Sequence, residues 1–274
     1  MADILADFTP ASMAHAVEAN LFAFFQHLAN WPRVELHDAA ECCWTLSDLP
    51  FPLFNSVLRA RLSAEDADAL IESRIRECQQ RQVPMLWWTG PSSEPADLDQ
   101  RLLRHGFFVE PAYGMVADLE RPATEVWPDR SITIETVHDR ETLDTWSRVL
   151  CQAFGAPQPF GEAFAELAMA IGLGDASPFR HFLARANGQA VATCSLFLGA
   201  GVAGIYDVST VPDRRKRGIG RLITRAAMQE ARALGYRMAI LHSSALGAGM
   251  YRALGFRDVC AIGQHVWSPD GFGR

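Results

Sequence analysis

Three features are missing from this sequence of 274 residues, and each absence narrows its class. No apolar run approaches the roughly 18 residues that a membrane span needs. The opening residues, MADILADFTPAS, lack the basic start and apolar core of a secretory signal. The six cysteines show no C-x-x-C pair and no regular spacing, which is typical of reduced thiols in a cytosolic protein. We therefore expect a cytoplasmic protein that makes no membrane contact.

Positive charge and metal-ligand patterns are also scarce. The formal net charge is -7 and the pI is about 5.6. An acidic chain does not attract nucleic acid or an anionic membrane through its overall field. The eight histidines form neither H-E-x-x-H nor a paired metal spacing, so we expect no metal. Any site for an anionic ligand must therefore be local.

Length and composition predict two globular domains. Hydrophobic residues make up 49% of the chain, and a typical domain has about 100 to 200 residues. The text ERPATEVWPDRS, from Glu120 to Ser131, holds two prolines and no helical or strand period, which indicates a linker. We expect a first domain over residues 1–122, a linker over 123–130 and a second domain over 131–274.

The second domain has clear periodicity, in the order β-α-α-β-β-β-α-β-α-β. An Asn187-Gly188 turn joins two of its strands. The first domain gives a fainter outline of similar order, and LLRHGF (102–107) echoes YRALGF (251–256). We therefore predict an α/β protein with two similar domains, in which helices flank a mixed, mostly antiparallel sheet.

One stretch, VPDRRKRGIGR (211–221), concentrates positive charge beside two glycines. It lies between a predicted strand and a predicted helix that begins near Ile219. Helix N-termini bind anions through their backbone N–H groups, and Gly218 and Gly220 let a ligand approach the backbone closely. The residues predict a pyrophosphate site, and a solvated basic turn at the start of a surface helix remains the alternative.

Two common phosphate motifs do not account for this stretch. The Walker A pattern G-x-x-x-x-G-K-[ST] is absent. A literal G-x-G-x-x-G occurs as GAGVAG (199–204), but a predicted strand follows it where a nucleotide-binding loop needs a helix. Those glycines predict a hairpin loop instead.

The two best motifs together resemble the GCN5-related N-acetyltransferases, the GNAT superfamily. Arg215-x-x-Gly218-x-Gly220 after a strand looks like the family's acyl-CoA motif. The later stretch HSSALGAGMYRALGF (242–256) is similar to its second motif, a strand followed by a short helix. The resemblance covers roughly residues 131–270. The first domain looks like a degenerate copy of the same fold.

The resemblance implies acetyl-CoA as cosubstrate. Backbone N–H groups of Lys216 to Arg221 would bind its pyrophosphate, and its pantetheine arm would pair with the strand at Val208–Thr210. The N–H near Val208 would polarise the thioester carbonyl. The cofactor-binding residues implied are Val208, Ser209, Thr210, Arg215, Lys216, Arg217, Gly218, Ile219, Gly220, Arg221 and Ser244.

The resemblance also assigns catalytic roles. Tyr251 occupies the general-acid position that protonates the leaving thiolate, with a packing tyrosine as the alternative. The attacking amine must lose a proton, and candidate bases are Asp207, next to the cofactor strand, and His242, on the following strand. Glu162 is a more distant candidate. A structural role is the alternative for each. The stretch from Phe154 to Phe160 is a candidate aromatic lid over the acceptor.

In the first domain, the stretch after the corresponding strand reads SAEDADALIESRI, with four carboxylates and no glycine. These carboxylates, which would repel a pyrophosphate, are Glu65, Asp66, Asp68 and Glu72. We therefore expect one cofactor site, in the second domain, and a structural or substrate-shaping first domain.

The implied activity is transfer of an acetyl or other acyl group from coenzyme A to a primary amine of a small molecule or peptide. The alternative is a regulatory module that binds acyl-CoA without turnover. The sequence leaves the acceptor, the acyl chain length and the base open, together with a possible homodimer.

Overall fold

The computed structural model describes residues 4–121 and 131–271, which we call the N-terminal half and the C-terminal half. The N-terminal half contains, in chain order, α1 (Pro10–Gln26), η1 (His27–Asn30), β1 (Val34–Asp38), β2 (Cys43–Ser47), η2 (Pro52–Phe54), β3 (Ser56–Leu58), α2 (Ala67–Arg81), β4 (Met85–Thr89), α3 (Leu98–Arg104) and β5 (Phe108–Asp118). The labels η mark short 3₁₀ helices.

The C-terminal half follows the predicted order of strands and helices. It contains β6 (Ile132–Thr136), α4 (Arg140–Phe154), α5 (Gln158–Ile171), β7 (Phe179–Ala186), β8 (Gln189–Gly199), β9 (Val202–Thr210), η3 (Pro212–Arg214), α6 (Ile219–Ala233), β10 (Met238–Ser243), α7 (Ala245–Ala253) and β11 (Arg257–Trp267). The predicted linker, 123–130, lies outside the described residues, so the division there remains a prediction.

Local turn chemistry accounts for the hairpins and helix ends of the C-terminal half. The β7–β8 turn places Asn187 and Gly188 at φ 49° and 80°, a left-handed pair that Asn-Gly adopts readily. The GAGVAG stretch forms the β8–β9 hairpin, as predicted. Helix α4 starts where the Asp139 carboxylate accepts the Thr142 N–H at 2.8 Å, and it ends at Gly155 with φ 68°.

The described strands form one sheet in the order β1-β2-β3-β4-β11-β5-β10-β9-β8-β7-β6. The two halves exchange their last strands. Strand β11 pairs antiparallel with β4, and β5 pairs antiparallel with β10. At the centre, β5 and β11 pair with each other. The parallel pairs are β3–β4 and β9–β10. The predicted mixed, mostly antiparallel α/β fold is confirmed, and the strand exchange was not foreseen.

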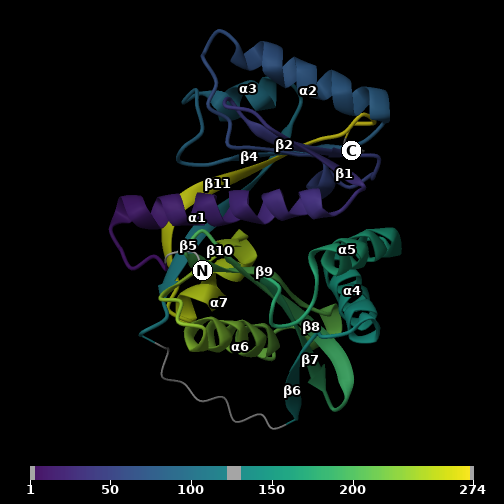
Figure 1. Ribbon diagram of the computed structural model, residues 1–274, viewed down its shortest axis with the longest axis vertical. Coiled ribbons are helices and arrows are strands. Elements are labelled where there is room, and N and C mark those ends of the chain that lie inside the picture. Colours follow the sequence, from purple (N-terminus) through teal and green to yellow (C-terminus); the bar gives the residue numbers. More distant parts are fainter. Residues whose placement is uncertain (1–3, 122–130, 272–274) are drawn as a thin grey trace.

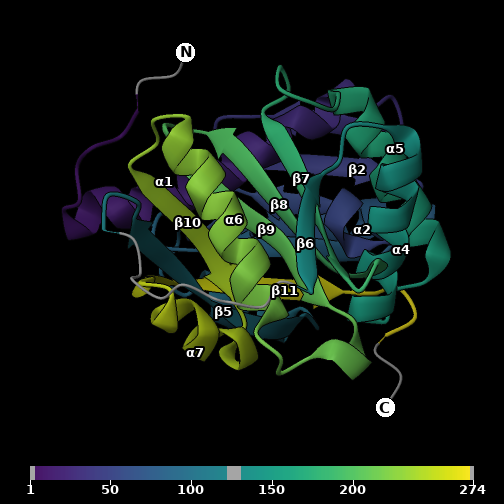
Figure 2. The same cartoon turned by 90° about the horizontal axis from the view of Figure 1, so that it is seen from below.

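Helix α1 forms an apolar layer between the two lobes that Figure 1 shows above and below it. Its Val17 and Phe25 share a buried cluster with Trp88 of β4 and Phe197 of β8. A second cluster joins α4, α6 and α7 to the sheet of the C-terminal half. In Figure 2, α6 crosses in front of β8 and β9, whereas α1 lies behind them. The sheet of the C-terminal half is therefore covered on both faces.

A buried amide fixes α1 on this sheet. Asn20 is fully buried, and its Nδ2 donates to the Gly199 carbonyl at 2.9 Å. The Tyr206 hydroxyl donates to the Asn20 Oδ1 at 2.7 Å. Beneath this contact lies Gly204, where a Cβ would come within 2.1 Å of the Asn20 Oδ1. The amide therefore ties the first helix to β9 of the other half, at a position where only glycine fits.

We expect Asn20→Ala to lower the free energy of unfolding by about 1–3 kcal/mol, because the buried Tyr206 hydroxyl and the Gly199 carbonyl lose their partner. The exposed residue Asn30 provides the control, since Asn30→Ala should change stability by less than about 0.5 kcal/mol. Urea denaturation followed by circular dichroism measures both variants. Equal losses in the two would contradict the role of Asn20.

Candidate functional site

The strands β9 and β10 separate in the middle of the C-terminal half. Their parallel pairing consists of Ala203 with Ala239 and Gly204 with Ile240. Beyond these pairs β9 continues to Thr210 and β10 to Ser243. Past the pair of Gly204 with Ile240, the facing edges of the two strands are therefore not paired with each other.

A β-bulge lies on β9 just past this separation. The β8–β9 register pairs Ser195 with Tyr206 and Thr193 with Ser209, so it passes over two residues, Asp207 and Val208. Asp207 has φ 54°, which is uncommon for a residue with a side chain. The Thr193 hydroxyl supports this conformation by donating to the Asp207 carbonyl at 2.7 Å. The bulge turns the backbone of β9 at the place where the resemblance puts the acyl group.

The predicted basic loop follows β9 and leads into α6. Its backbone is left-handed at Lys216 (φ 60°) and at Gly218 (φ 77°), the N-cap of α6. No side chain caps this helix, so its first amides carry the positive end of the helix dipole without a side-chain acceptor. Lys216 and Arg217 are exposed beside them. The arrangement is compatible with the predicted anion site, which stays a prediction.

Arg215 has a different role from its neighbours. Its Nε donates to the Thr210 carbonyl at 3.1 Å, and its Nη2 donates to the Ala153 carbonyl at the end of α4 at 2.5 Å. The guanidinium thus holds the loop against β9 and α4. Ser244 also makes a local contact: its hydroxyl accepts the Gly247 N–H at 3.4 Å and caps α7. Sequence reasoning expected both residues to contact the cofactor, which these local contacts leave untested.

Gly220 lies where α6 approaches α7. A Cβ at this position would lie 3.3 Å from the Met250 sulfur and 3.6 Å from the Thr210 Oγ1. Glycine therefore keeps the start of α6 open on the side that faces the end of β9.

Tyr251, the predicted general acid, is buried on α7. Burial raises the pKa of its phenol, and the nearby Cys194 thiol of β8 acts in the same direction. Cys194 lies opposite the bulge of β9, so Tyr251 belongs to the side of the sheet that α6 and α7 cover. Its phenol stays protonated at neutral pH and is able to donate a proton.

Asp207 has the properties of a base near neutral pH. Burial raises its pKa to about 6, although a hydrogen bond with the Ser195 hydroxyl acts in the opposite direction. Its Oδ2 is buried and has no hydrogen-bond partner among the described residues. A carboxylate with one oxygen unpartnered and a pKa near 6 is able to accept a proton at pH 7.

His242 is enclosed between the sheet and α1. Its ring lies 6.0 Å from the rings of both Trp88 and Tyr206. Burial lowers its pKa to about 4, and a hydrogen bond to the Val17 backbone opposes this effect. Its Nε2 has no partner among the described residues. A histidine covered by a helix has poorer access to an acceptor than Asp207, so we rank Asp207 first as the base.

The remaining acceptor-side candidates separate in the structure. Glu162 is exposed on α5. Phe160 packs between the two halves, with its ring 5.3 Å from that of Phe51 and 6.1 Å from that of Phe54. Phe154 is 60% exposed at the end of α4. The N-terminal half therefore contacts α5 through aromatic rings, whereas Phe154 is the residue of the predicted lid that has room to move.

The sequence did not predict one buried polar group in the sheet of the C-terminal half. His181 of β7 is buried, and its Nδ1 lies 2.8 Å from the Ser195 Oγ of β8. Both residues lie in strands whose mostly apolar sequences predict buried core, and only the strand register brings them together.

The N-terminal half contains a matching pair of parallel strands, β3 and β4, but its own chain fills the space beyond them. The Glu94 N–H donates to the Ala60 carbonyl at 2.9 Å, and the Leu62 N–H donates to the Glu94 carbonyl at 3.1 Å. Glu94 also forms a parallel bridge with Arg61. In this half the chain occupies the position that the resemblance gives to the pantetheine arm.

The start of α2 in the N-terminal half carries its own anion. The Asp68 carboxylate in the first turn forms an ion pair with Arg101 of α3 and a hydrogen bond of 2.9 Å with the His105 Nε2. The hydrogen bond with His105 holds the pKa of Asp68 below its usual range. The side chains of Arg101 and His105 at this helix start are thus already paired within the chain.

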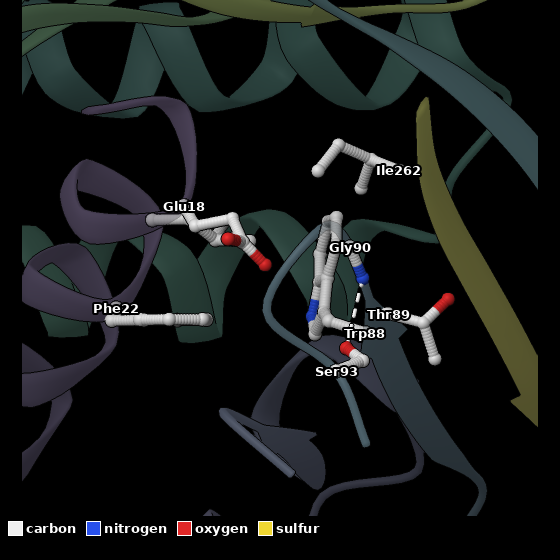
Figure 3. A pocket seen from close by; sticks show the side chains of 8 residues that line it. Glu18, Phe22, Trp88, Thr89, Gly90, Ser93 and Ile262 are labelled. Carbon is white, nitrogen blue, oxygen red and sulfur yellow. Dashed lines mark hydrogen bonds between the residues drawn. The ribbon is translucent and has the colours of Figure 1, made fainter. Parts of the chain in front are cut away.

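A small hollow lies beside this filled region, between α1, the end of β4 and β11 (Figure 3). The Glu18 carboxylate at its wall accepts the Ser92 N–H at 3.1 Å and the Ser92 hydroxyl at 3.0 Å. The Gly90 N–H donates to the Ser93 Oγ at 2.9 Å. The lining residues are Glu18, Leu21, Phe22, Trp88, Thr89, Gly90, Ser93 and Ile262. The predicted site residues lie elsewhere.

Two features are absent from the described residues. Over 4–121 and 131–271, no three His, Cys, Asp or Glu side chains gather as a metal site would require. In the same ranges, no helix combines the length and hydropathy of a membrane span.

Comparisons with known proteins agree with the geometry. Residues 177–258 match the family model described as an acetyltransferase (GNAT) domain. This match supports an N-acetyltransferase activity in general terms. No curated protein matches the chain.

Solved structures of GNAT proteins share the fold. A GCN5-related N-acetyltransferase from Kribbella flavida matches with a TM-score of 0.71 at 18% identity, over 92% of this chain and 96% of that one. One from Sphaerobacter thermophilus gives 0.63 at 18% identity, over 100% and 97%. A tandem GNAT protein from the clavulanic acid biosynthesis pathway gives 0.61 at 13% identity, over 100% and 99%. The chain therefore shares the fold of these GNAT proteins over most of its length.

We expect Asp207→Asn to gain stability relative to the wild type as the pH rises from about 4 to 7. The folded-state pKa of Asp207, about 6, lies above its ordinary 3.8, so the wild type loses this group's contribution as the pH rises through that range. The asparagine variant lacks the titration and should gain roughly 1–3 kcal/mol over the range. Urea titrations of both proteins at several pH values measure the difference. A difference that does not change with pH would contradict the burial of this carboxyl.

Proposed function

We propose that the protein is an acyl-CoA-dependent N-acyltransferase with one working site, in the C-terminal half. The observation that carries this proposal is the separation of β9 from β10 next to the bulge at Asp207 and Val208, followed by the uncapped N-terminus of α6. The acceptor is a primary amine of a small molecule or peptide. GNAT membership supports the class of reaction, and these contacts support the assignment of the site.

The cosubstrate would lie along the unpaired edge of β9. Backbone groups of Val208 to Thr210 would pair with the pantetheine arm as an added strand does. The pyrophosphate would lie at the N-terminus of α6, against the amides that follow Gly218, with Lys216 and Arg217 beside it. Arg215 would keep the loop in the conformation that presents these amides.

The bulge would separate the two proton transfers of the reaction. The acceptor ammonium, with a pKa of about 10, gives a proton to Asp207 and becomes a neutral amine. Its nitrogen attacks the thioester carbonyl, whose oxygen the backbone N–H near Val208 stabilises. The carbon–sulfur bond then breaks, and Tyr251 protonates the thiolate from the side that α7 covers. The nitrogen loses its second proton to solvent, and solvent returns a proton to Tyr251. The products are the amide and coenzyme A.

The N-terminal half would shape the acceptor side without binding a second cosubstrate. Glu94 pairs where a pantetheine arm would enter, and Asp68 places a negative charge at the start of α2. Phe51 and Phe54 meanwhile contact Phe160 of α5. This half therefore supplies a wall of the working site.

We expect calorimetric titration with acetyl-CoA to give one binding event per chain, because only one of the two parallel strand pairs is open. Arg217→Ala should weaken binding about twofold to fivefold, as an exposed charge pair does. Arg76→Ala, an exposed arginine of α2, should leave the affinity unchanged and is the matched control. No binding would overturn the proposal, and two binding events would contradict the closed N-terminal site.

We expect Tyr251→Phe to lower kcat about 10²- to 10⁴-fold without changing the affinity for acetyl-CoA, because the thiolate loses its proton donor. A thiol-release assay over a panel of amines measures turnover. Tyr236→Phe, at a partly buried tyrosine outside the site, is the control. Full activity of Tyr251→Phe would make Tyr251 a packing residue. Binding of acetyl-CoA without turnover of any amine would favour a regulatory acyl-CoA-binding module instead.

A further inference from the structure

A buried threonine faces the bulge from the neighbouring strand. Thr193 of β8 is fully buried, and the strand register places it opposite Ser209 of β9. Its hydroxyl reaches the bulge and donates to the Asp207 carbonyl at 2.7 Å. The same hydroxyl oxygen lies 2.7 Å from the Ser209 Oγ, and Ser209 is also buried. One hydroxyl of β8 therefore contacts the first residue of the bulge and the residue that follows the bulge.

The direction of these two hydrogen bonds follows from the number of protons. Thr193 has one hydroxyl proton, and a carbonyl oxygen accepts only, so this proton points toward Asp207. The Thr193 oxygen must then accept the proton of the Ser209 hydroxyl. With one bond donated and one accepted, the Thr193 hydroxyl is held in a single orientation, and its proton is committed to the carbonyl.

The carbonyl that Thr193 holds belongs to the same peptide unit as the N–H of Val208. This peptide bond is trans, and in a planar trans peptide the C=O and N–H bonds point in opposite directions. A hydrogen bond that fixes the Asp207 carbonyl toward Thr193 therefore fixes the Val208 N–H away from Thr193 and β8. Rotation of this peptide unit would break the bond to the threonine.

The side of β9 away from β8 is open at Val208. Strand β10 is the neighbour on that side, and its parallel pairing with β9 ends at Gly204. The register of β9 with β8 also passes over Val208. In the described sheet, Val208 thus has no paired residue on either neighbouring strand, so its N–H can serve a ligand that lies along this edge.

The backbone of the bulge needs support to keep this arrangement. Asp207 has φ 54°, a conformation that costs energy for a residue with a side chain. The strand register holds the bulge at both ends, through Tyr206 before it and Ser209 after it. Between these ends, the Thr193 hydroxyl supplies a side-chain hydrogen bond to the bulge backbone. A strained backbone that a buried hydroxyl holds from one side is typical of a functional position.

We propose that Thr193 is a positioning residue for acyl transfer: by holding the Asp207 carbonyl, its hydroxyl aims the Val208 N–H at the oxygen of the thioester carbonyl. This inference rests on the proposed N-acyltransferase function and adds the residue that orients its oxyanion donor. When the amine nitrogen bonds to the carbonyl carbon, the π electron pair of the C=O bond moves to the oxygen, where the N–H stabilises it. When that pair returns, the carbon–sulfur bond breaks and its electrons leave with the sulfur. The proton transfers are those of the proposed function, and Thr193 does not touch the substrate.

The first test compares Thr193→Val, Thr193→Ser and wild type in the thiol-release assay. Valine keeps the shape of threonine without the hydroxyl, so kcat should fall about 10- to 100-fold, somewhat less than for complete loss of an oxyanion-hole donor. Serine keeps the hydroxyl and should restore most of kcat. The affinity for acetyl-CoA, measured by calorimetry, should not change in either variant. Equal losses of kcat in the two variants would make Thr193 a packing residue and overturn the inference.

Thr45→Val is the matched control. Thr45 is buried in β2, and its hydroxyl oxygen accepts the Ser56 N–H at 3.0 Å, so this substitution also removes a buried strand hydroxyl. It should keep the wild-type kcat, and a loss equal to that in Thr193→Val would assign the effect to stability and overturn the inference. If Thr193→Val does not fold, Thr193→Ser and Thr193→Ala, which differ by one hydroxyl, replace it. The serine variant should then turn over faster, and equal kcat values overturn the inference.

An infrared difference spectrum of the complex with acetyl-CoA, isotope-labelled at the thioester carbonyl, gives a readout that needs no amine. In wild type, the hydrogen bond from the Val208 N–H should lower the carbonyl stretching frequency below that of free acetyl-CoA. In Thr193→Val the band should move back toward the free position, and in Thr193→Ser it should stay lowered. A wild-type band at the free position overturns the inference, as do equal bands in wild type and Thr193→Val.

The outcomes distinguish this inference from the proposed function. If wild type acetylates amines while the band and kcat are unchanged in Thr193→Val, the function stands and the inference falls. If the band is lowered in wild type and moves back in Thr193→Val, but no amine reacts, Thr193 orients the Val208 N–H as inferred and the proposed transfer to an amine falls.

Discussion

The exchange of β5 and β11 is the constraint on which the rest of the structure depends. A β-strand needs a hydrogen-bond partner on each side unless it lies at an edge, and the partners of β4 and β10 come from the opposite half of the chain. The pairing of β5 with β11 joins the two exchanged strands at the centre of the sheet. Neither half has a complete sheet without the other, and α1 covers the junction with an apolar layer. The position of β9 is thereby coupled to residues more than a hundred positions away, as the contact of Asn20 with Tyr206 illustrates.

The same local plan has two outcomes in this chain. In both halves a parallel strand pair opens toward the start of a helix. In the N-terminal half, Glu94 pairs with the extension of β3, and Asp68 is paired with Arg101 and hydrogen bonds with His105. In the C-terminal half the helix start has no side-chain cap, and exposed Lys216 and Arg217 lie beside it. A backbone edge that already has a hydrogen-bond partner cannot pair with a ligand, so the two halves differ in what their parallel strand pairs leave open.

The bulge on β9 interrupts the strand at Asp207 and Val208. Val208, Cys194 and Tyr251 belong to the cluster under α6 and α7. The Asp207 carboxyl precedes Val208 in the bulge, and its Oδ2 has no hydrogen-bond partner among the described residues. In a regular strand, side chains alternate between the two faces and every residue has a partner on the neighbouring strand. The extra residue of the bulge leaves a stretch of β9 backbone unpaired, and at the same point the backbone of Asp207 is strained.

Local signals in the sequence determined the order of helices and strands, the Asn187-Gly188 turn and the basic loop at the start of α6. These features depend on neighbouring residues, through periodicity, turn chemistry and charge, and they were correctly predicted. The tertiary structure alone decided which strands pair, because hydrogen-bond partners in a sheet carry no local label. It also decided that Arg215 holds the loop by backbone carbonyls and that His242 lies beneath α1. The buried contact of His181 with Ser195 could not be predicted for the same reason: the two residues are 14 positions apart, and the register of β7 with β8 brings them to 2.8 Å.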